Sequence, residues 1–208
     1  MNKKYIENYL FLIKEKLLKN LSTIILAVLF VLVGIVLGII LSVGGNTILK
    51  VLSSQDQTMS YYVYGSADIS AIFFNRLFIY IFALMVIFVF CLHYYSSFLS
   101  LIYITYQSMI FAIGVSSLID YHGVIGILLS IFFAVPINLL LLLLLVIEYV
   151  ICLERAKTCQ KYKLKFAHSF ANNFWLDMLS ILIIALIILV VANLIYPLVF
   201  RGILIINY

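Results

Sequence analysis

The sequence predicts an all-α fold, a polytopic transmembrane helical bundle of about five spans that forms one membrane domain over residues 1–208. Two observations predict this class. Hydrophobic residues make up 66% of the chain and charged residues only 10%, whereas a soluble domain carries about 25% charged residues. The apolar residues also fall into five runs, each at least as long as the ~20 residues that cross a bilayer as a helix. A chain this apolar cannot cover a soluble surface, so we expect it in the cell membrane.

The five expected spans are 22–43, 69–92, 98–118, 124–153 and 175–200. The first is longer than the apolar core of a signal peptide, and no small-residue cleavage site follows it, so we expect a retained helix. The fourth would be about 45 Å long, and Pro136 near its middle removes one backbone hydrogen bond. We expect one tilted, bent span there, with two half-helices or a re-entrant element as the alternative.

The basic residues predict the orientation. Segment 1–21 is Lys-rich and amphipathic, and segment 154–174 is a second basic stretch. With five spans both lie on one side, which the positive-inside rule assigns to the cytoplasm. Segment 44–68 is then an outer loop, as is the short turn 119–123, which gives an N-in, C-out protein. We expect the lipid bilayer, and not nucleic acid, to contact most of the chain.

Polar side chains within apolar runs are the first candidates for function, because they are costly at membrane depth. Arg76, next to Asn75, lies about two turns inside the second span. One interpretation is an interface anchor that reaches the headgroups, paired with Asp68. The other is a buried node that ties this helix to a neighbour.

Two carboxyl groups lie at similar depth near the cytoplasmic side, Glu148 in the fourth span and Asp177 in the fifth. They can form a proton- or cation-binding pair, meet Lys or Arg of the basic loop, or reach the headgroup layer. Closer to the midplane the polar residues are the neutral Gln107, Asn138 and Asn193, for which we expect hydrogen bonds between helices.

Gly34 and Gly38 in the first span form a GxxxG spacing, which lets two helix backbones approach closely. We expect these glycines to pack against another helix of the same chain and not to form a dimer contact.

The search for catalytic and metal motifs finds none of the usual signatures. The three histidines, His93, His122 and His168, lie in separate segments without zinc-ligand spacing. Ser116 and Ser117 near Asp120 have no accompanying oxyanion-hole motif. We therefore expect no catalytic site, metal or cofactor, and no enzyme activity. The three cysteines, Cys91, Cys152 and Cys159, form no CxxC pair, and we expect reduced thiols.

Three stretches are similar to a known family. They are FVLVGIVLGIIL from Phe30 to Leu41, ISAIFFNRLFIYIFAL from Ile69 to Leu84 with its Asn75, and Pro136-Ile137-Asn138 followed by Glu148. Together with the helix order and the long loop after the first span, they resemble the stage II sporulation protein M family over about residues 22–155. The chain departs from that family in having only Gly114 in the third span and a Glu farther from the Pro.

The resemblance implies a non-enzymatic, multi-pass protein of the cell membrane. In sporulating bacteria such a protein holds cell-wall-degrading partners at the septal membrane, and relatives also occur in organisms that do not sporulate. The implied function is a scaffold or assembly subunit for envelope or cell-wall remodelling partners. The alternative is the permease subunit of an ATP-driven exporter or of an immunity system, whose cytoplasmic ATPase would contact segment 154–174 or the N-terminal helix.

Overall fold

The computed structural model describes residues 18–43, 69–162 and 178–191. All the secondary structure in these ranges is helical and none is strand, so the all-α prediction is confirmed. The elements are α2 (Leu21–Val43), α5 (Ile69–Phe90), α6 (Ser97–Leu129), the π-helical segment η1 (Ser130–Ala134), α7 (Val135–Tyr162) and a last helix, Met178–Val191.

Three stretches within the described residues are long and apolar enough to cross a membrane: Leu21–Val43, Ser97–Ser117 and Val135–Lys161. The chain therefore has the composition and helix lengths of a membrane protein. The described apolar parts of the other two helices, Leu77–Phe90 and Met178–Val191, are shorter.

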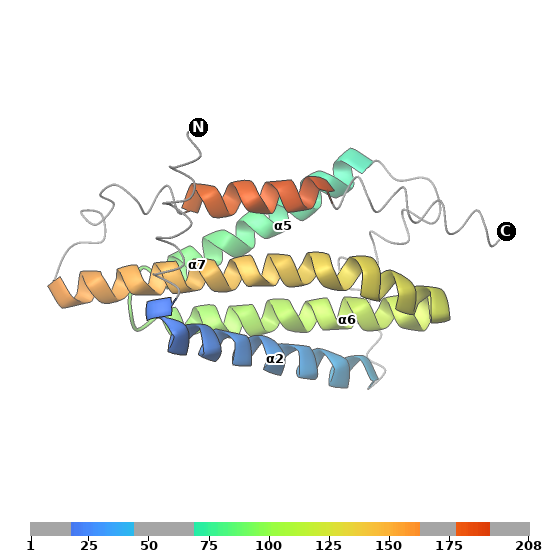
Figure 1. The fold of residues 1–208 in the computed structure, drawn as a ribbon, viewed down its shortest axis with the longest axis horizontal. Helices are drawn as coiled ribbons and strands as arrows, with labels where there is room; N and C mark the ends of the chain where they lie inside the picture. The colour runs from blue at the N-terminus through green and yellow to red at the C-terminus, as the bar shows by residue number, and fades with distance from the viewer. Residues whose placement is uncertain (1–17, 44–68, 163–177, 192–208) are drawn as a thin grey trace.

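The described helices form an elongated bundle (Figure 1). In the order α2, α5, α6 and α7 they alternate in direction along its long axis, and α5 crosses the others at an angle. As a result, the start of α2, the turn between α5 and α6, and the end of α7 all lie at one end of the bundle, on the left of Figure 1. We call this end the turn end.

Small side chains bring α2 close to α6. The buried face of α2 repeats every three or four residues, which is the helical period, and consists of Thr23, Ala27, Val31, Gly34, Gly38 and Ser42. A Cβ atom added at Gly38 would lie 2.7 Å from Cβ of Ala112, and one added at Gly34 would collide with Ser108 Oγ and the Thr105 carbonyl. The GxxxG spacing thus faces α6 of the same chain.

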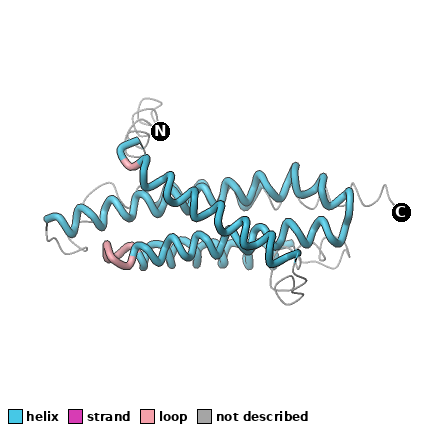
Figure 2. The backbone as a smooth tube through the Cα atoms, turned by 90° about the horizontal axis from the view of Figure 1, so that it is seen from below, coloured by secondary structure: helices cyan, strands magenta, loops and turns pink. Residues whose placement is uncertain are grey.

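The turn between α5 and α6 is held by serine hydroxyl groups. The Ser96 hydroxyl donates to the carbonyl of Phe90 at 2.6 Å, and the Ser97 hydroxyl donates to the carbonyl of Tyr94 at 2.6 Å. The Ser96 bond satisfies a carbonyl at the end of α5, where the last carbonyls have no partner within the helix. The Ser97 bond adds to the backbone bond from the Ser97 N–H to the same Tyr94 carbonyl. Figure 2 draws this turn as the pink loop at the left of the molecule. The second span is helical to Phe90, two residues short of the expected end at 92.

A single glycine breaks α6 where the turn 119–123 was expected. Helical hydrogen bonding extends to Leu129, but Gly123 has φ 56° and ψ −127°. This is the conformation of the first central residue of a type II′ turn, which glycine adopts without strain. The observed turn is therefore shorter than the predicted turn 119–123, since the residues before Gly123 remain helical. Beyond it the chain runs back toward the turn end (Figure 1).

The fourth predicted span, 124–153, differs from the expected single bent helix. A π-helical segment, Ser130–Ala134, precedes Pro136, which lies at the second position of α7. Proline lacks the N–H and its ring collides with the carbonyl four residues earlier, so an inserted residue relieves the conflict. At the other end α7 continues to Tyr162, and the first nine residues of the predicted loop 154–174 are helical.

The other expected segments fall partly outside the described residues. Segment 44–68 lies wholly outside them, as does 1–17 of the N-terminal segment. Of the fifth expected span, 175–200, the structure describes Met178–Val191, which is helical.

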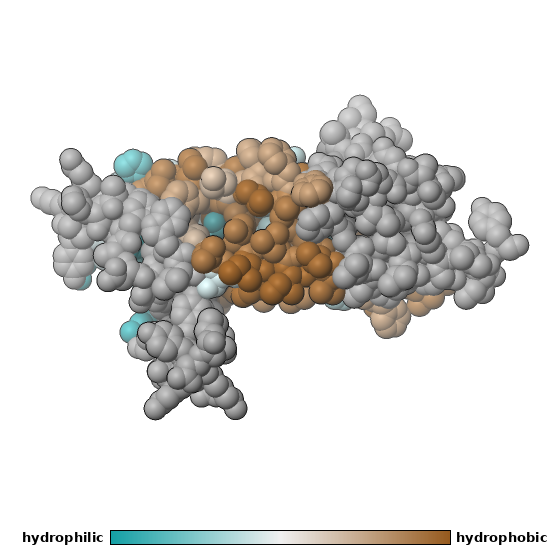
Figure 3. All heavy atoms as spheres, turned by 90° about the horizontal axis from the view of Figure 1, so that it is seen from above, coloured by the Kyte–Doolittle hydropathy of each residue, from teal (hydrophilic) through white to brown (hydrophobic). Residues whose placement is uncertain are grey.

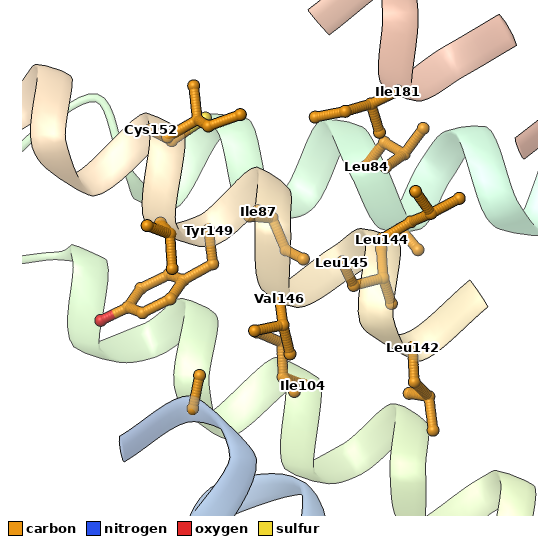
Figure 4. Close-up of a cluster of buried hydrophobic side chains, with 14 of the residues drawn as sticks. Leu84, Ile87, Ile104, Leu142, Leu144, Leu145, Val146, Tyr149, Cys152 and Ile181 are labelled. Carbon is orange, nitrogen blue, oxygen red and sulfur yellow. The ribbon is translucent and has the colours of Figure 1, made fainter. Parts of the chain in front are cut away.

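The core lies where α5, α6 and α7 meet. Figure 4 shows Ile87 of α5 and Ile104 of α6 directed toward Val146 of α7, all fully or almost fully buried. Close by, Ile181 of the last helix contacts the same core cluster. The outward faces of the described helices carry apolar side chains, which form the brown band across the middle of Figure 3. Such a surface suits hydrocarbon and not water.

Candidate functional site

One stripe of α7 is buried along most of its length. It consists of Leu145, Glu148, Cys152, Ala156 and Cys159, which repeat every three or four residues and therefore lie on one face of the helix. Four of these five side chains are small or apolar. Glu148 is the exception, and it is the buried carboxyl group of the described residues.

The Glu148 side chain is only 2% exposed to solvent. Its Oε2 atom has no hydrogen-bond partner within the part of the chain that the structure describes. A carboxyl group in such a place is costly when ionised, because it has lost water and gained no donor. Native proteins keep few such groups, and those in membrane spans are commonly functional.

Neutral hydrogen-bonding groups surround this carboxyl group. The Tyr80 hydroxyl of α5 donates to the carbonyl of Leu141 at 2.7 Å, which ties α5 to α7 about two turns from Glu148. Glu148 interacts electrostatically with Tyr80, with the thiol of Cys91 just after α5 and with the thiol of Cys152 in α7.

The two thiols form a small polar cluster with α6. Sγ of Cys91 lies 3.4 Å from Oγ of Ser100, and a side-chain hydrogen bond links Cys91 with Cys152. All three side chains are 0% exposed, and both cysteines are free thiols. Two helices, α6 and α7, and the turn after α5 therefore contribute weak donors to one buried region on the turn-end side of Glu148.

This arrangement can hold a proton more readily than a metal ion. Within the described ranges, no group of three His, Cys, Asp or Glu side chains converges as a metal ion would require. Hard cations also need several oxygen ligands, whereas Glu148 has thiols and a tyrosine that already donates to a carbonyl. A carboxyl group accepts a proton without any further ligand.

Three of the predicted intramembrane polar residues have side chains outside the described part of the structure. Asn75 and Arg76 belong to the helical backbone of α5, and Asp177 precedes the last described helix. The proposed pairings of Arg76 with Asp68 and of Glu148 with Asp177 therefore stay predictions.

For Gln107 and Asn138 the prediction of hydrogen bonds between helices is wrong, because each amide donates to a group one turn earlier in the chain. Asn138 Nδ2 donates to the carbonyl of Ala134 at 2.8 Å, and Gln107 Nε2 donates to the Tyr103 hydroxyl at 2.7 Å. Both acceptors lie one helical turn earlier, where they are the nearest groups available. Asn193 lies outside the described residues. Pro136 is exposed on the outside of the bundle.

The sequence predicts some of the neighbours of Glu148 and not others. The spacing of Glu148 and Cys152, four residues apart on a helix, places both on one face of α7 and was available from the sequence. The sequence does not identify Tyr80 and Ser100 as neighbours of Glu148, because nothing in one apolar helix specifies which residue of another helix it will contact. A Tyr or Ser inside an apolar run is the available signal, since its hydroxyl needs an acceptor.

A second polar region lies at the turn end. The last turns of α7 carry Arg155, Lys157 and Lys161, and Gln160 Nε2 donates to the Tyr95 hydroxyl at 3.1 Å. This bond joins the end of α7 to the turn between α5 and α6. We call these five residues the basic end surface.

Scans of protein-family models, curated proteins and solved structures find no match to this chain, so its resemblance to the stage II sporulation protein M family remains an expectation from the sequence.

Proposed function

We propose that the chain is a five-span protein of the cell membrane that works as a non-enzymatic scaffold or assembly subunit. In this proposal the N-terminus and segment 154–174 are cytoplasmic, and the C-terminus is outside. The alternating directions of α2, α5, α6 and α7 support such a topology (Figure 1). The basic residues at the end of α7 lie at the same end of the bundle as the start of α2, as the positive-inside rule requires.

The observation that carries the scaffold proposal is the length of α7, which exceeds the thickness of the hydrocarbon layer. Its 28 residues measure about 42 Å, against about 30 Å of hydrocarbon. The excess presents the basic end surface, which the Tyr95–Gln160 bond attaches to the rest of the bundle. A rigid, cationic surface held by a membrane bundle suits a partner protein with an acidic face.

The test is cross-linking in cells with a photoreactive residue in place of Lys157 or Tyr95, both exposed. A matched probe replaces Ile102, an exposed residue on the apolar face of α6. The proposal expects adducts with envelope-assembly proteins or cell-wall hydrolases from the two turn-end positions and lipid adducts alone from position 102. Cross-linking of only lipid from all three positions would contradict it.

The second candidate is the permease subunit of an ATP-driven exporter or immunity system, and the burial of Glu148 favours it. Buried carboxyl groups in membrane spans often mark ion or proton pathways in transporters. In the same cross-linking experiment, a stoichiometric cytoplasmic ATPase captured at Lys157 would replace the scaffold with this function. Loss of a transport phenotype in Glu148→Gln at unchanged protein level would point the same way.

A further inference from the structure

We propose that the Glu148 carboxyl group is an exchangeable proton-binding site in the core of the bundle, where α5, α6 and α7 meet. The proposal does not depend on the scaffold function, because it concerns the interior of the bundle and not its partner surface.

The environment of the Glu148 carboxyl group disfavours a charge. Glu148 is 2% exposed, and its Oε2 has no hydrogen-bond partner among the described residues. A charge in this place would need an opposite charge or several donors. A bound proton removes the charge and converts one oxygen into a donor, which is the simplest way to keep the group in an apolar core.

The groups facing Glu148 are hydroxyl and thiol groups and not basic side chains. The titratable neighbours in electrostatic contact with it are Tyr80 from α5, Cys91 from the turn and Cys152 from α7. Ser100 is the polar contribution of α6 to the adjacent cluster, bonded to Cys91. Neither α2 nor the last described helix contains any titratable residue. Within the described residues no basic side chain supplies a counter-ion at this place, so a proton is the cation that fits.

Small side chains lead from Glu148 toward the turn end. Between Glu148 and that end, the buried stripe of α7 presents Cys152, Ala156 and Cys159, and Cys91 and Ser100 lie beside Cys152. In the other direction along α7, the same stripe carries the large side chain of Leu145, and Leu142 and Leu144 are buried beside it (Figure 4). A proton is therefore expected to enter and leave from the turn end, where the polar groups are.

The consequence is a coupling between proton binding and helix packing. With the proton bound, the junction of α5, α6 and α7 is neutral and packs as the structure has it. Without the proton, the charge favours a looser junction that admits water, because an ionised carboxylate buried without donors is unstable.

The test is a pH-difference infrared spectrum of the full chain in lipid, recorded during perfusion between acidic and alkaline buffer. The proposal expects a reversible C=O band of a protonated carboxyl group in an apolar setting. Glu148→Gln should abolish this band, and Glu148→Asp should retain it at a shifted frequency. The matched control Glu154→Gln changes the next acidic residue of α7, which is partly exposed, and should leave the band unchanged.

Two results would overturn the proposal. In one, the spectrum of Glu148→Gln equals that of the unchanged protein, although both elute as the same folded species from a sizing column. In the other, adding Na⁺ or K⁺ at constant pH removes the band, which would make the site one for a metal cation. Neither result alters the cross-linking outcome at Lys157 or Tyr95, so failure of this proposal is distinguishable from failure of the scaffold function.

Discussion

At the scale of single residues, small groups set how closely the helices approach. Gly34 and Gly38 face Ser108 and Ala112 of α6. Across the same interface the Thr105 hydroxyl lies 3.3 Å from the carbonyl of Phe30, in addition to its 2.9 Å bond to the carbonyl of Leu101 in its own helix. In a bilayer, where lipid is as apolar as leucine, close backbone contact and such hydrogen bonds replace the hydrophobic drive for association.

We expect Gly34→Val to lower the free energy of unfolding by about 1–3 kcal/mol, as overpacked substitutions do. The added Cβ would meet the Thr105 carbonyl, which cannot move unless α6 moves. Titration with SDS in mixed micelles measures the change. The control is Val36→Leu on the outward face of α2, where Val36 is 54% exposed and about ±0.5 kcal/mol is expected. Equal stability of the two variants would contradict the α2–α6 contact.

Tyr80→Phe tests the link between α5 and α7. The variant removes only the hydroxyl that donates to the Leu141 carbonyl at 2.7 Å. We expect a loss of about 0.6–1.5 kcal/mol, the range for single hydrogen bonds in membrane bundles. The same SDS titration applies, with the exposed Tyr106→Phe as the control. A loss no greater than that of the control would mean that this bond does not hold the two helices together.

The sequence supports some residue-level inferences and not others. The spacing of Gly34 and Gly38 predicts a close contact, but it cannot name α6 as the partner. The position of Glu148 near the end of its apolar run predicts a place close to the membrane surface. In the structure, however, its side chain lies on the face of α7 that is buried in the bundle. Depth follows from counting residues, whereas direction depends on the neighbouring helices. The amides of Gln107 and Asn138 bond locally for a similar reason, since one-turn acceptors are always present and partners on other helices are not.

At the scale of elements, proline and glycine determine the shape of the chain between α6 and α7. Gly123 reverses the chain with a positive φ, and the π segment Ser130–Ala134 lies just before Pro136. The sequence predicted a reversal and a kink at these two places. It could not predict a π turn, because the same proline can also be accommodated by a simple bend.

Pro136→Ala should convert the π segment to an α-helix. The alanine restores an N–H donor and removes the ring, so the inserted residue is no longer needed. Residues before position 134 should then rotate by about 100° about the helix axis relative to α7. Phe132, now 66% exposed, would turn toward the bundle.

The measurement is the oxygen accessibility of a spin label at position 132, in a background without the native cysteines. Accessibility should fall in Pro136→Ala. A label at Leu143, which is 51% exposed on α7, serves as the control and should not change. An unchanged label at position 132 would show that the π segment does not depend on the proline.

At the scale of the whole molecule, composition predicted the class of protein, and the basic segments predicted its orientation. The all-helical architecture follows from apolar runs that can satisfy their backbone in a bilayer only as helices. The lengths of the apolar runs predict the ends of the helices less accurately, since α7 continues nine residues past the expected end of its span. Most of those residues are good helix formers, so the helix continues beyond the apolar run.

The central claim is a five-span bundle with its basic end in the cytoplasm, and thiol labelling in intact cells tests it most directly. In a variant lacking Cys91, Cys152 and Cys159, single cysteines replace Lys3, Ser54, Lys161 or Tyr208. The account predicts that a membrane-impermeant maleimide labels positions 54 and 208 in intact cells and positions 3 and 161 only after permeabilisation. Labelling of positions 3 and 208 from the same side would mean an even number of spans and would contradict it.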